Sequence, residues 1–315
     1  MGGSQASLGW RTSIMSFSPF SITVPGTTAN LGPGFDSIGM AFNRYLRLNV
    51  LPSEKTEYHF SGQINKPLPL ENNLVHTAAE TIAKRHGMEL PPFLAEMDSE
   101  LPLAKGLGSS AAAIAAGIEL ADQVLKFNLS LHEKLTEACL LEGHPDNVVP
   151  AFTGGIMISH FSDGELITLQ APPPRVELVM AMPFQEWATK ESRNALPDHL
   201  DFGKAVRAGS CSSILVASLY KGDWQTACRV MEKDLYHEPY RAPFISEYSA
   251  VKDAAAALGA YGGAISGAGP SIVIFTEPQT GKKLAHALQE KFQQYEFEVL
   301  LPDLEGTKIS QLTLK

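Results

Sequence analysis

The alternation of hydrophobic and polar positions along the chain predicts a mixture of short strands and longer helices. Strands are expected where apolar and β-branched residues alternate or form short runs between turn signals, and helices where apolar residues recur every three or four positions. The predicted strands are Phe20–Val24, Arg44–Leu51, Tyr58–Gly62, Pro92–Asp98, Gly154–Phe161, Glu165–Gln170, Val176–Met182, Ser271–Phe275 and Phe297–Leu301. The predicted helices are Asn73–His86, an Ala-rich helix after Gly108, Leu131–Leu141, Ala205–Tyr220, Trp224–Leu235, Glu247–Leu258 and Gly281–Tyr295.

Turn and cap residues divide this pattern. Gly87 closes the first helix, and Ser130 and Gly143 are the expected N-cap and C-terminal stop of the helix between them. Pro172-Pro-Pro174 is the clearest linker, so we place a domain boundary there. The predicted organisation is a loose Gly/Ser-rich tail over 1–18, an N-terminal domain over 19–171 and a C-terminal domain over 172–315.

Composition narrows the class of protein. The 315 residues suggest about two domains, each with its own core. A net charge of −9 and a pI near 5.5 disfavour nucleic acid or an anionic membrane as the main partner. Cys139, Cys211 and Cys228 are odd in number and lack metal-type spacing, which indicates reduced thiols and a cytoplasmic protein. No apolar run is long enough to predict a membrane span.

The segment Pro102–Leu125, PLAKGLGSSAAAIAAGIELADQVL, predicts a glycine turn that leads into a helix. The unpaired N–H groups and the positive dipole end of a helix N-terminus favour anions, so we interpret this segment as a phosphate cradle. A simple helix cap is the alternative interpretation. The segment is not a Walker A loop, because no Gly-Lys-Ser/Thr is present. Gly106, Gly108 and Ala111 match the dinucleotide pattern only weakly, since no suitable strand and acid accompany them.

Two polar loops supply further candidate chemistry. Pro25–Asp36 offers Asn30 and Asp36 to a small polar ligand, although it also reads as a plain turn between strands. Glu142–Asn147 gathers Glu142, His144, Asp146 and Asn147 in a predicted loop after a helix end, where such a concentration raises the odds of a site.

A second glycine-rich turn covers Gly262–Pro270, between a helix and a strand. Its four glycines within eight residues exceed what a packing corner requires. We therefore expect its backbone to pass close to another loop or to a ligand.

Three segments together resemble the homoserine kinase branch of the GHMP small-molecule kinase superfamily. They are VPGTTANLGPGFDSIGMAF (Val24–Phe42), LPLAKGLGSSAAA (Leu101–Ala113) and AISGAGPSIVIF (Ala264–Phe275), with EGHPDNVVPAFTGG and HEPYRAP in support. Gly26 and Ser271 depart from the family pattern without removing a functional group. The resemblance implies an α+β, two-domain GHMP kinase fold: an S5-like N-terminal domain with a left-handed βαβ crossover and a ferredoxin-like C-terminal domain, with the active site between them.

The resemblance also implies ATP- and Mg²⁺-dependent phosphorylation of the L-homoserine hydroxyl, a step of threonine biosynthesis. Ser110 and Glu142 would hold Mg²⁺, which prefers oxygen ligands, with Glu137 as the alternative carboxylate. The ATP phosphates would be wrapped by Pro102, Leu103, Ala104, Lys105, Gly106, Leu107, Gly108, Ser109, Ser110, Ala111 and Ala112.

The substrate roles follow from the same resemblance. Asn30 and Asp36 would meet the amino and hydroxyl end of homoserine, with Asn147 nearby. The guanidinium groups of Arg193 and Arg241 match the geometry of the carboxylate, and Thr189 would add a hydroxyl contact. Because phosphoryl transfer asks mainly for alignment and charge neutralisation, we hypothesise that no strong base acts and that Asn147, Mg²⁺ and the phosphate loop carry the rate.

Two other functions remain to be weighed. A related kinase for mevalonate-type or sugar substrates would have no amino-acid carboxylate to clamp. A non-catalytic ATP- or dinucleotide-binding regulator would have no use for a metal carboxylate beside a second polar pocket. The resemblance allows a homodimer, although no apolar stripe in the sequence indicates an interface. Asn72, Asn73 and Tyr58–Leu70 are weak candidates for the adenine pocket.

Overall fold

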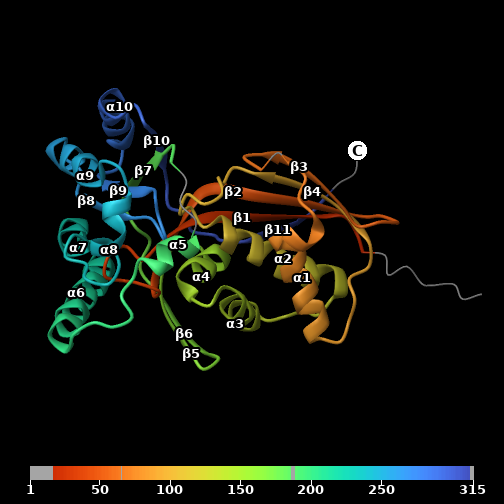
Figure 1. Ribbon diagram of the computed structural model, residues 1–315. Coiled ribbons are helices and arrows are strands. Elements are labelled where there is room, and N and C mark those ends of the chain that lie inside the picture. The colour runs from red at the N-terminus through yellow and green to blue at the C-terminus, as the bar shows by residue number, and fades with distance from the viewer. Residues whose placement is uncertain (1–16, 65, 186–188, 313–315) are drawn as a thin grey trace, which may run out of the picture.

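The computed structural model describes residues 17–64, 66–185 and 189–312, without the side chains of 189–191. Within them the strands form two separate sheets (Figure 1). The larger sheet has the order β11-β1-β2-β4-β3, and β5 and β6 extend it from β2 as a hairpin. Its strands are β1 Phe20–Ala29, β2 Ile38–Pro52, β3 Glu57–Gly62, β4 Phe93–Ser99, β5 Ile156–Ser162, β6 Glu165–Gln170 and β11 Lys308–Gln311.

Helices cover one side of this sheet. They are α1 Leu74–Arg85, α2 Ser109–Leu125, α3 Leu131–Glu142 and α4 Pro145–Thr153, with a 3-10 turn at Leu70–Asn72 (Figure 1). β3 and β4 pair in parallel and α1 connects them, which is the predicted βαβ crossover. α2 is buried along nearly its whole length, because its small alanine side chains let the sheet, α1, α3 and α4 all pack around it.

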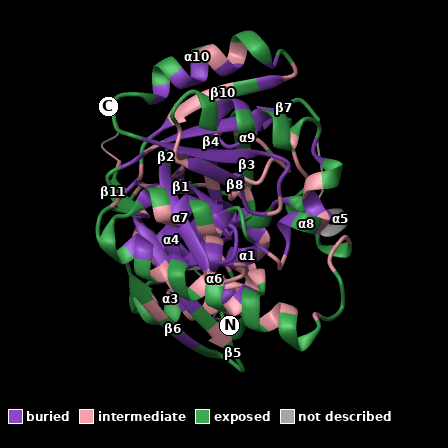
Figure 2. Cartoon of the chain, turned by 90° about the vertical axis from the view of Figure 1, so that its left-hand side faces the viewer, coloured by how far each residue is buried: buried purple, intermediate pink, exposed green. Residues whose placement is uncertain are grey.

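The smaller sheet is antiparallel and has the order β10-β7-β9-β8. It is made of β7 Glu177–Pro183, β8 Gly262–Ile265, β9 Ile272–Thr276 and β10 Tyr295–Leu300. Its helices are α5 Thr189–Asn194, α6 Phe202–Lys221, α7 Trp224–Met231, α8 Glu238–Arg241, α9 Tyr248–Ala257 and α10 Gly281–Lys291, with a 3-10 turn at Ala242–Phe244. Figure 2 shows the buried strands of both sheets enclosed by helices whose outer faces are exposed. The predicted α+β fold is confirmed, with one sheet and its helices in each half of the chain.

The predicted strands and long helices occur, and the capping box at Ser130 and the stop at Gly143 are confirmed. The structure corrects four segments that we predicted as loops or turns. β1 continues through a bulge at Pro25/Gly26 to Ala29, so the first part of the predicted Pro25–Asp36 loop is strand. Glu142–Asn147 contains the start of α4, and His237–Pro243 contains α8. The predicted turn Gly262–Pro270 begins with the strand β8. α4 and α8 each have a proline in the first turn, where its absent N–H costs nothing, and this signal could have revealed them. The short helix α5 was not predicted either.

The two ends of the chain contribute to the larger sheet. Most of the predicted tail, residues 1–16, lies outside the described residues, whereas Phe17 is buried and its ring packs edge-on against Phe20. β11, which the pattern did not predict, pairs with β1, so the last described strand joins the sheet that holds the first. The domain division at residue 172 stays a prediction. Among the described helices, none combines the length and the apolar character needed to cross a bilayer.

We predict that Gly117→Ala destabilises the fold through the α1–α2 contact. A Cβ at Gly117 would lie 2.4 Å from the carbonyl oxygen of Val75, so α1 must shift away. Overpacking of this kind costs about 1–3 kcal/mol of unfolding free energy, which urea denaturation would measure. The control is Gly209→Ala on α6, where nothing lies within 4 Å of the added methyl group and a small gain is expected. An equal effect of the two substitutions would contradict the packing argument.

Candidate functional site

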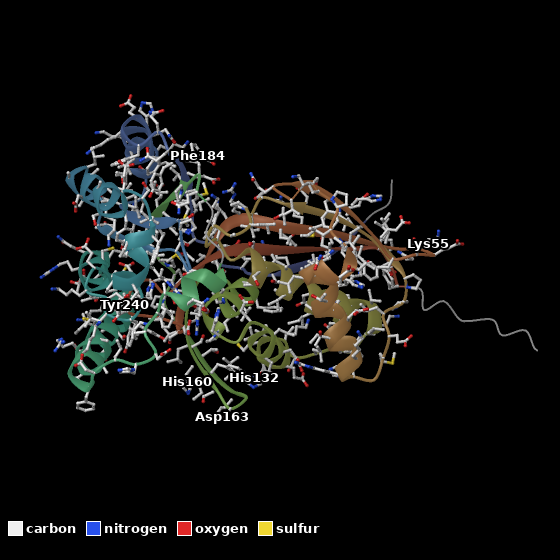
Figure 3. The ribbon with its side chains drawn as sticks, in the orientation of Figure 1. Lys55, His132, His160, Asp163, Phe184 and Tyr240 are labelled. Carbon is white, nitrogen blue, oxygen red and sulfur yellow. The ribbon has the colours of Figure 1, made fainter. Side chains whose placement is uncertain are left out.

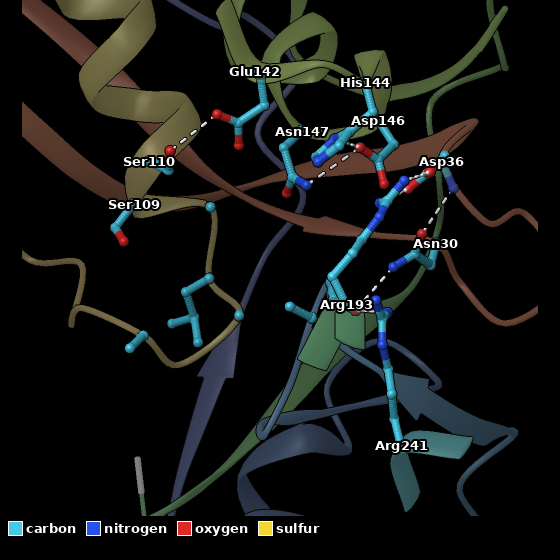
Figure 4. A pocket seen from close by; sticks show the side chains of 16 residues that line it. Asn30, Asp36, Ser109, Ser110, Glu142, His144, Asp146, Asn147, Arg193 and Arg241 are labelled. Carbon is cyan, nitrogen blue, oxygen red and sulfur yellow. Dashed lines mark hydrogen bonds and ion pairs between the residues drawn. The ribbon is translucent and has the colours of Figure 1, made fainter. Parts of the chain in front are cut away.

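A cavity of about 100 Å³ lies where the loops of the two halves meet, and it gathers most of the residues singled out from the sequence (Figure 4). It is lined by Asn30, Asp36, Ala104, Gly106, Leu107, Gly108, Ser109, Ser110, Glu142, His144, Asp146, Asn147, Arg193, Arg241, Gly267 and Ala268. Other titratable groups, such as His132, His160 and Asp163, lie on the exposed surface of the larger half (Figure 3).

The glycine turn between β4 and α2 forms one wall of this cavity. Gly108 is the N-cap of α2 with φ of 73°, and a Cβ there would lie 2.0 Å from Thr27 Oγ1, so only glycine fits. The N–H of Ala112 already donates to the carbonyl of Gly108 at 2.9 Å. The N–H groups of Ser109–Ala111, in the first turn, have no intrahelical acceptor. The turn therefore presents backbone donors at a positive helix end, as the sequence predicted.

Not all residues of the predicted cradle line this cavity. Lys105 turns its ammonium group to the carbonyls of Pro183, Phe184 and Gln185, at 2.8, 3.0 and 2.5 Å. Leu103 is exposed, and the side chains of Ala111 and Ala112 are in the core. Pro102 and Lys105 line a neighbouring cavity instead. Lys105 thus fastens the glycine turn to the end of β7 rather than facing the cavity.

Ser110 and Glu142 meet in the cavity, and Glu137 does not enter it. The Ser110 hydroxyl donates to Glu142 Oε2 at 3.0 Å, across the start of α2 and the end of α3. Burial raises the pKa of Glu142, although the charge of His144 and the hydrogen bond from Ser110 oppose this effect. Glu137 instead forms an ion pair with Arg85 of α1.

The first turn of α4 places His144, Asp146 and Asn147 on the opposite wall (Figure 4). His144 Nδ1 lies 2.6 Å from Asp146 Oδ1. Burial disfavours the imidazolium, but the hydrogen bond and charge of Asp146, with the charges of Asp36 and Glu142, raise the pKa of His144 to about 9. His144 is therefore protonated at pH 7.

Asn147 accepts a hydrogen bond from the Thr27 hydroxyl at 2.9 Å, which orients its amide.

The loop after β1 presents Asn30 and Asp36. The Asn30 amide donates to the carbonyl of Gly267 at 2.8 Å and accepts from the N–H of Asp36 at 2.9 Å. Asn30 thus holds its own loop against the C-terminal half. Both terminal nitrogens of Arg193 donate to the carboxylate of Asp36, at 2.9 and 2.6 Å, and form a bidentate ion pair. Asp36, His144 and Asp146 also bring ligand atoms within 4.8 Å of one another, but these internal pairings already occupy them.

Arg241 enters the cavity from α8, beside Arg193 of α5 (Figure 4). It is only 2% exposed, and it donates to the carbonyls of Ser192 at 3.3 Å and Gly267 at 3.2 Å. Burial lowers the pKa of Arg241 to about 10, so the guanidinium still carries its charge at pH 7. Thr189 begins α5, and its side chain lies outside the described residues.

The second glycine-rich turn passes directly over the first, as predicted. A Cβ on Gly106 would lie 2.2 Å from the carbonyl oxygen of Ser266, and the Ser266 hydroxyl donates to the carbonyl of Gly106 at 2.6 Å. Gly267 and Ala268 line the cavity, although the sequence did not single out these two residues. The only sequence signal for them was the density of glycines in the turn.

The cavity thus combines a helix N-terminus that presents N–H donors, a hydroxyl–carboxylate pair and two guanidinium groups on different walls. Such a site can hold two anionic groups at once, one at the glycine turn and one at the arginines. The oxygen donors of Ser110 and Glu142 are of the type that Mg²⁺ prefers.

Comparisons with known proteins agree with this geometry. The family model of the GHMP kinases N terminal domain matches residues 73–155, and that of the GHMP kinases C terminal matches residues 215–294. A homoserine kinase of Bacillus licheniformis is 44% identical over 286 residues, covering 90% of this chain and 94% of its own. A homoserine kinase of Bacillus velezensis is 42% identical over 94% of this chain and 96% of its own.

A solved structure shows the same arrangement. The crystal structure of homoserine kinase from Cytophaga hutchinsonii superposes with a TM-score of 0.82 at 29% identity, covering 93% of this chain and 98% of the other.

We predict that His144 titrates near pH 9 in the folded, Mg²⁺-free protein. Its folded pKa lies above the ordinary value of 6.5, so the stabilisation from the Asp146 contact is complete below pH 6.5 and is lost as the pH rises through 9. NMR titration of the His144 ring would measure the midpoint. Asp146→Asn, which removes the negative partner, should move that midpoint down by at least one unit. A wild-type midpoint near 6.5 would refute the charged pair.

Proposed function

This chain belongs to the GHMP kinases, and from that premise we propose that it phosphorylates the hydroxyl of L-homoserine with ATP, giving O-phospho-L-homoserine. The observation that carries the proposal is the buried guanidinium of Arg241 in the same cavity as the glycine turn. A buried, charged arginine requires an anion to complete its surroundings, and an amino-acid carboxylate fits its planar donors. The family resemblance and the homoserine kinase relatives support the same substrate.

ATP would bind with its phosphates at the glycine turn. The first-turn N–H groups of α2 supply donors, and the helix dipole favours the negative charge. The residues assigned to the phosphates are those of the turn that line the cavity, Ala104 and Gly106–Ser110. Lys105 would not contact the phosphates and would instead hold the glycine turn in place through its hydrogen bonds at the end of β7.

Mg²⁺ would bind between Ser110 and Glu142. The fit rests on their 3.0 Å contact beside the glycine turn and on the half-buried carboxylate of Glu142, which forms no ion pair among the described residues. A cation would compensate that charge. When bound, the metal neutralises charge on the phosphates of ATP.

L-Homoserine would bind with its carboxylate at Arg193 and Arg241 and its ammonium group at Asp36. The ion pair of Asp36 with Arg193 supports this assignment, because the ammonium group would replace a cation that the carboxylate already accepts. Asn147 lies on the wall between this region and the glycine turn, where its amide would orient the hydroxyl. Thr189 stays a weaker candidate.

Phosphoryl transfer depends on the alignment of the two substrates more than on a general base. In a loose transition state the charge gathers on the transferring phosphoryl oxygens, so fixed positive groups and N–H donors give the main stabilisation. The chain offers them in the α2 N-terminus and in His144, which is charged at pH 7. Asp146 is engaged by His144, which supports the hypothesis that no strong base acts. Threonine biosynthesis, the cytoplasm and a homodimer stay predictions.

We predict that the purified protein releases ADP with ATP, Mg²⁺ and L-homoserine, and not with L-threonine, L-serine, mevalonate or galactose. Arg241→Met should raise KM for L-homoserine by about 30-fold to 1000-fold, since losing one partner of a buried charged contact costs about 2–4 kcal/mol. KM for ATP should stay unchanged, and Arg229→Met on the exposed side of α7 is the control. Turnover with a neutral alcohol alone would keep the fold but remove the carboxylate clamp.

We predict that Glu142→Gln, and not Glu137→Gln, raises the Mg²⁺ concentration needed for half-maximal activity, by about ten-fold or more. The two glutamates lie on the same helix, but only Glu142 contacts Ser110. Titrating Mg²⁺ at saturating ATP and L-homoserine would measure the shift. A shift in Glu137→Gln alone would assign the metal to the other carboxylate.

A further inference from the structure

The ring of Phe35 lies close to both arginines of the proposed substrate site. The guanidinium carbons of Arg193 and Arg241 are 5.3 and 5.4 Å from its centroid. The imidazole of His237 stacks on the same ring, with centroids 5.4 Å apart and an interplanar angle of 23°. Phe35 directly precedes Asp36 in the loop that meets the C-terminal half. One aromatic ring from the N-terminal half thus contacts both cations that the C-terminal half supplies.

This arrangement answers an electrostatic problem. Two guanidinium groups near one ring repel each other, and the charge of Arg193 adds to the effect of burial in lowering the pKa of Arg241. The face of an aromatic ring carries negative quadrupole charge and attracts a cation within about 6 Å. Phe35 therefore offsets the repulsion without bringing a second carboxylate, which would compete with the substrate's own carboxylate for the arginines.

His237 contacts both the ring of Phe35 and the guanidinium of Arg241. It is fully buried, and Arg241 Nη1 lies 3.3 Å from its Nδ1, while Nε2 lies 3.1 Å from the carbonyl oxygen of Gly32. Arginine has no acceptor, so Nδ1 must accept and the proton sits on Nε2, which donates to Gly32. The imidazole is thereby tied at once to α8 and to the loop that carries Phe35.

Resting on the function above, we propose that Phe35 is a positioning residue that sets the spacing of the Arg193–Arg241 pair and thereby selects substrates with a carboxylate beside the amino group. It acts through the arginines and does not touch the reacting atoms. A plain packing role would require the ring's volume only, whereas this role requires its π face toward Arg193 and Arg241. That difference can be measured.

The test compares Phe35→Leu, which keeps apolar volume, with Phe35→Tyr, which keeps the ring. Phe35→Leu should raise KM for L-homoserine between about two-fold and thirty-fold while kcat and KM for ATP stay within about two-fold. Phe35→Tyr should keep the wild-type KM. 3-Aminopropan-1-ol, the same molecule without the carboxylate, should bind both variants and the wild type equally, measured as a substrate or as a competitive inhibitor. Phe127→Leu, where a ring stacks on His86 away from the cavity, is the control.

The outcomes separate the two proposals. A wild-type protein inactive on L-homoserine would overturn the proposed function itself. If the wild type is active, three results would each overturn the positioning role. The first is an unchanged KM for L-homoserine in Phe35→Leu, and the second is an equal loss of binding for 3-aminopropan-1-ol. The third is a fall in kcat and melting temperature that Phe35→Tyr shares. A loss confined to the substrate with a carboxylate would support it.

Discussion

The carbonyl groups of one short turn, Ser266–Ala268, hold the site together. The carbonyl of Gly267 accepts from Asn30 at 2.8 Å and from Arg241 at 3.2 Å, and the carbonyl of Ala268 accepts from Ser192 at 2.6 Å. The N–H of Gly267 donates to Ala29, and the hydroxyl of Ser266 reaches the glycine turn. Carbonyl oxygens carry two lone pairs each, so one turn can fasten four segments from both halves of the chain.

This constraint explains why glycine is needed where it occurs. The two turns approach so closely that a methyl group at Gly106 would meet the carbonyl of Ser266, and each such contact fixes one loop relative to the other. Lys105 adds a second link, from the first turn to the end of β7. The phosphate side and the substrate side of the cavity are therefore parts of one hydrogen-bonded unit rather than two independent loops.

Four charged side chains of the cavity form two pairs of opposite sign. Arg193 and Asp36 pair with each other, as do His144 and Asp146, so each of these four charges has a compensating group. Glu142 and Arg241 are the exceptions, since burial works against the charged form of both. Groups of that kind mark the places where a bound cation and a bound anion bring the largest gain, and they lie where the metal and the carboxylate are proposed.

The sequence by itself determined most strands, most long helices, the glycine turn at a helix start and the residue types of the pocket, because periodicity, caps and glycine density are local signals. It left Glu142 and Glu137 as alternatives and missed α4, α5, α8, β8 and β11. Only the tertiary structure decided that Lys105 points away from the cavity, that Glu142 meets Ser110 and that Phe35 contacts two arginines. Those facts depend on contacts between residues far apart in the chain, which local pattern does not encode.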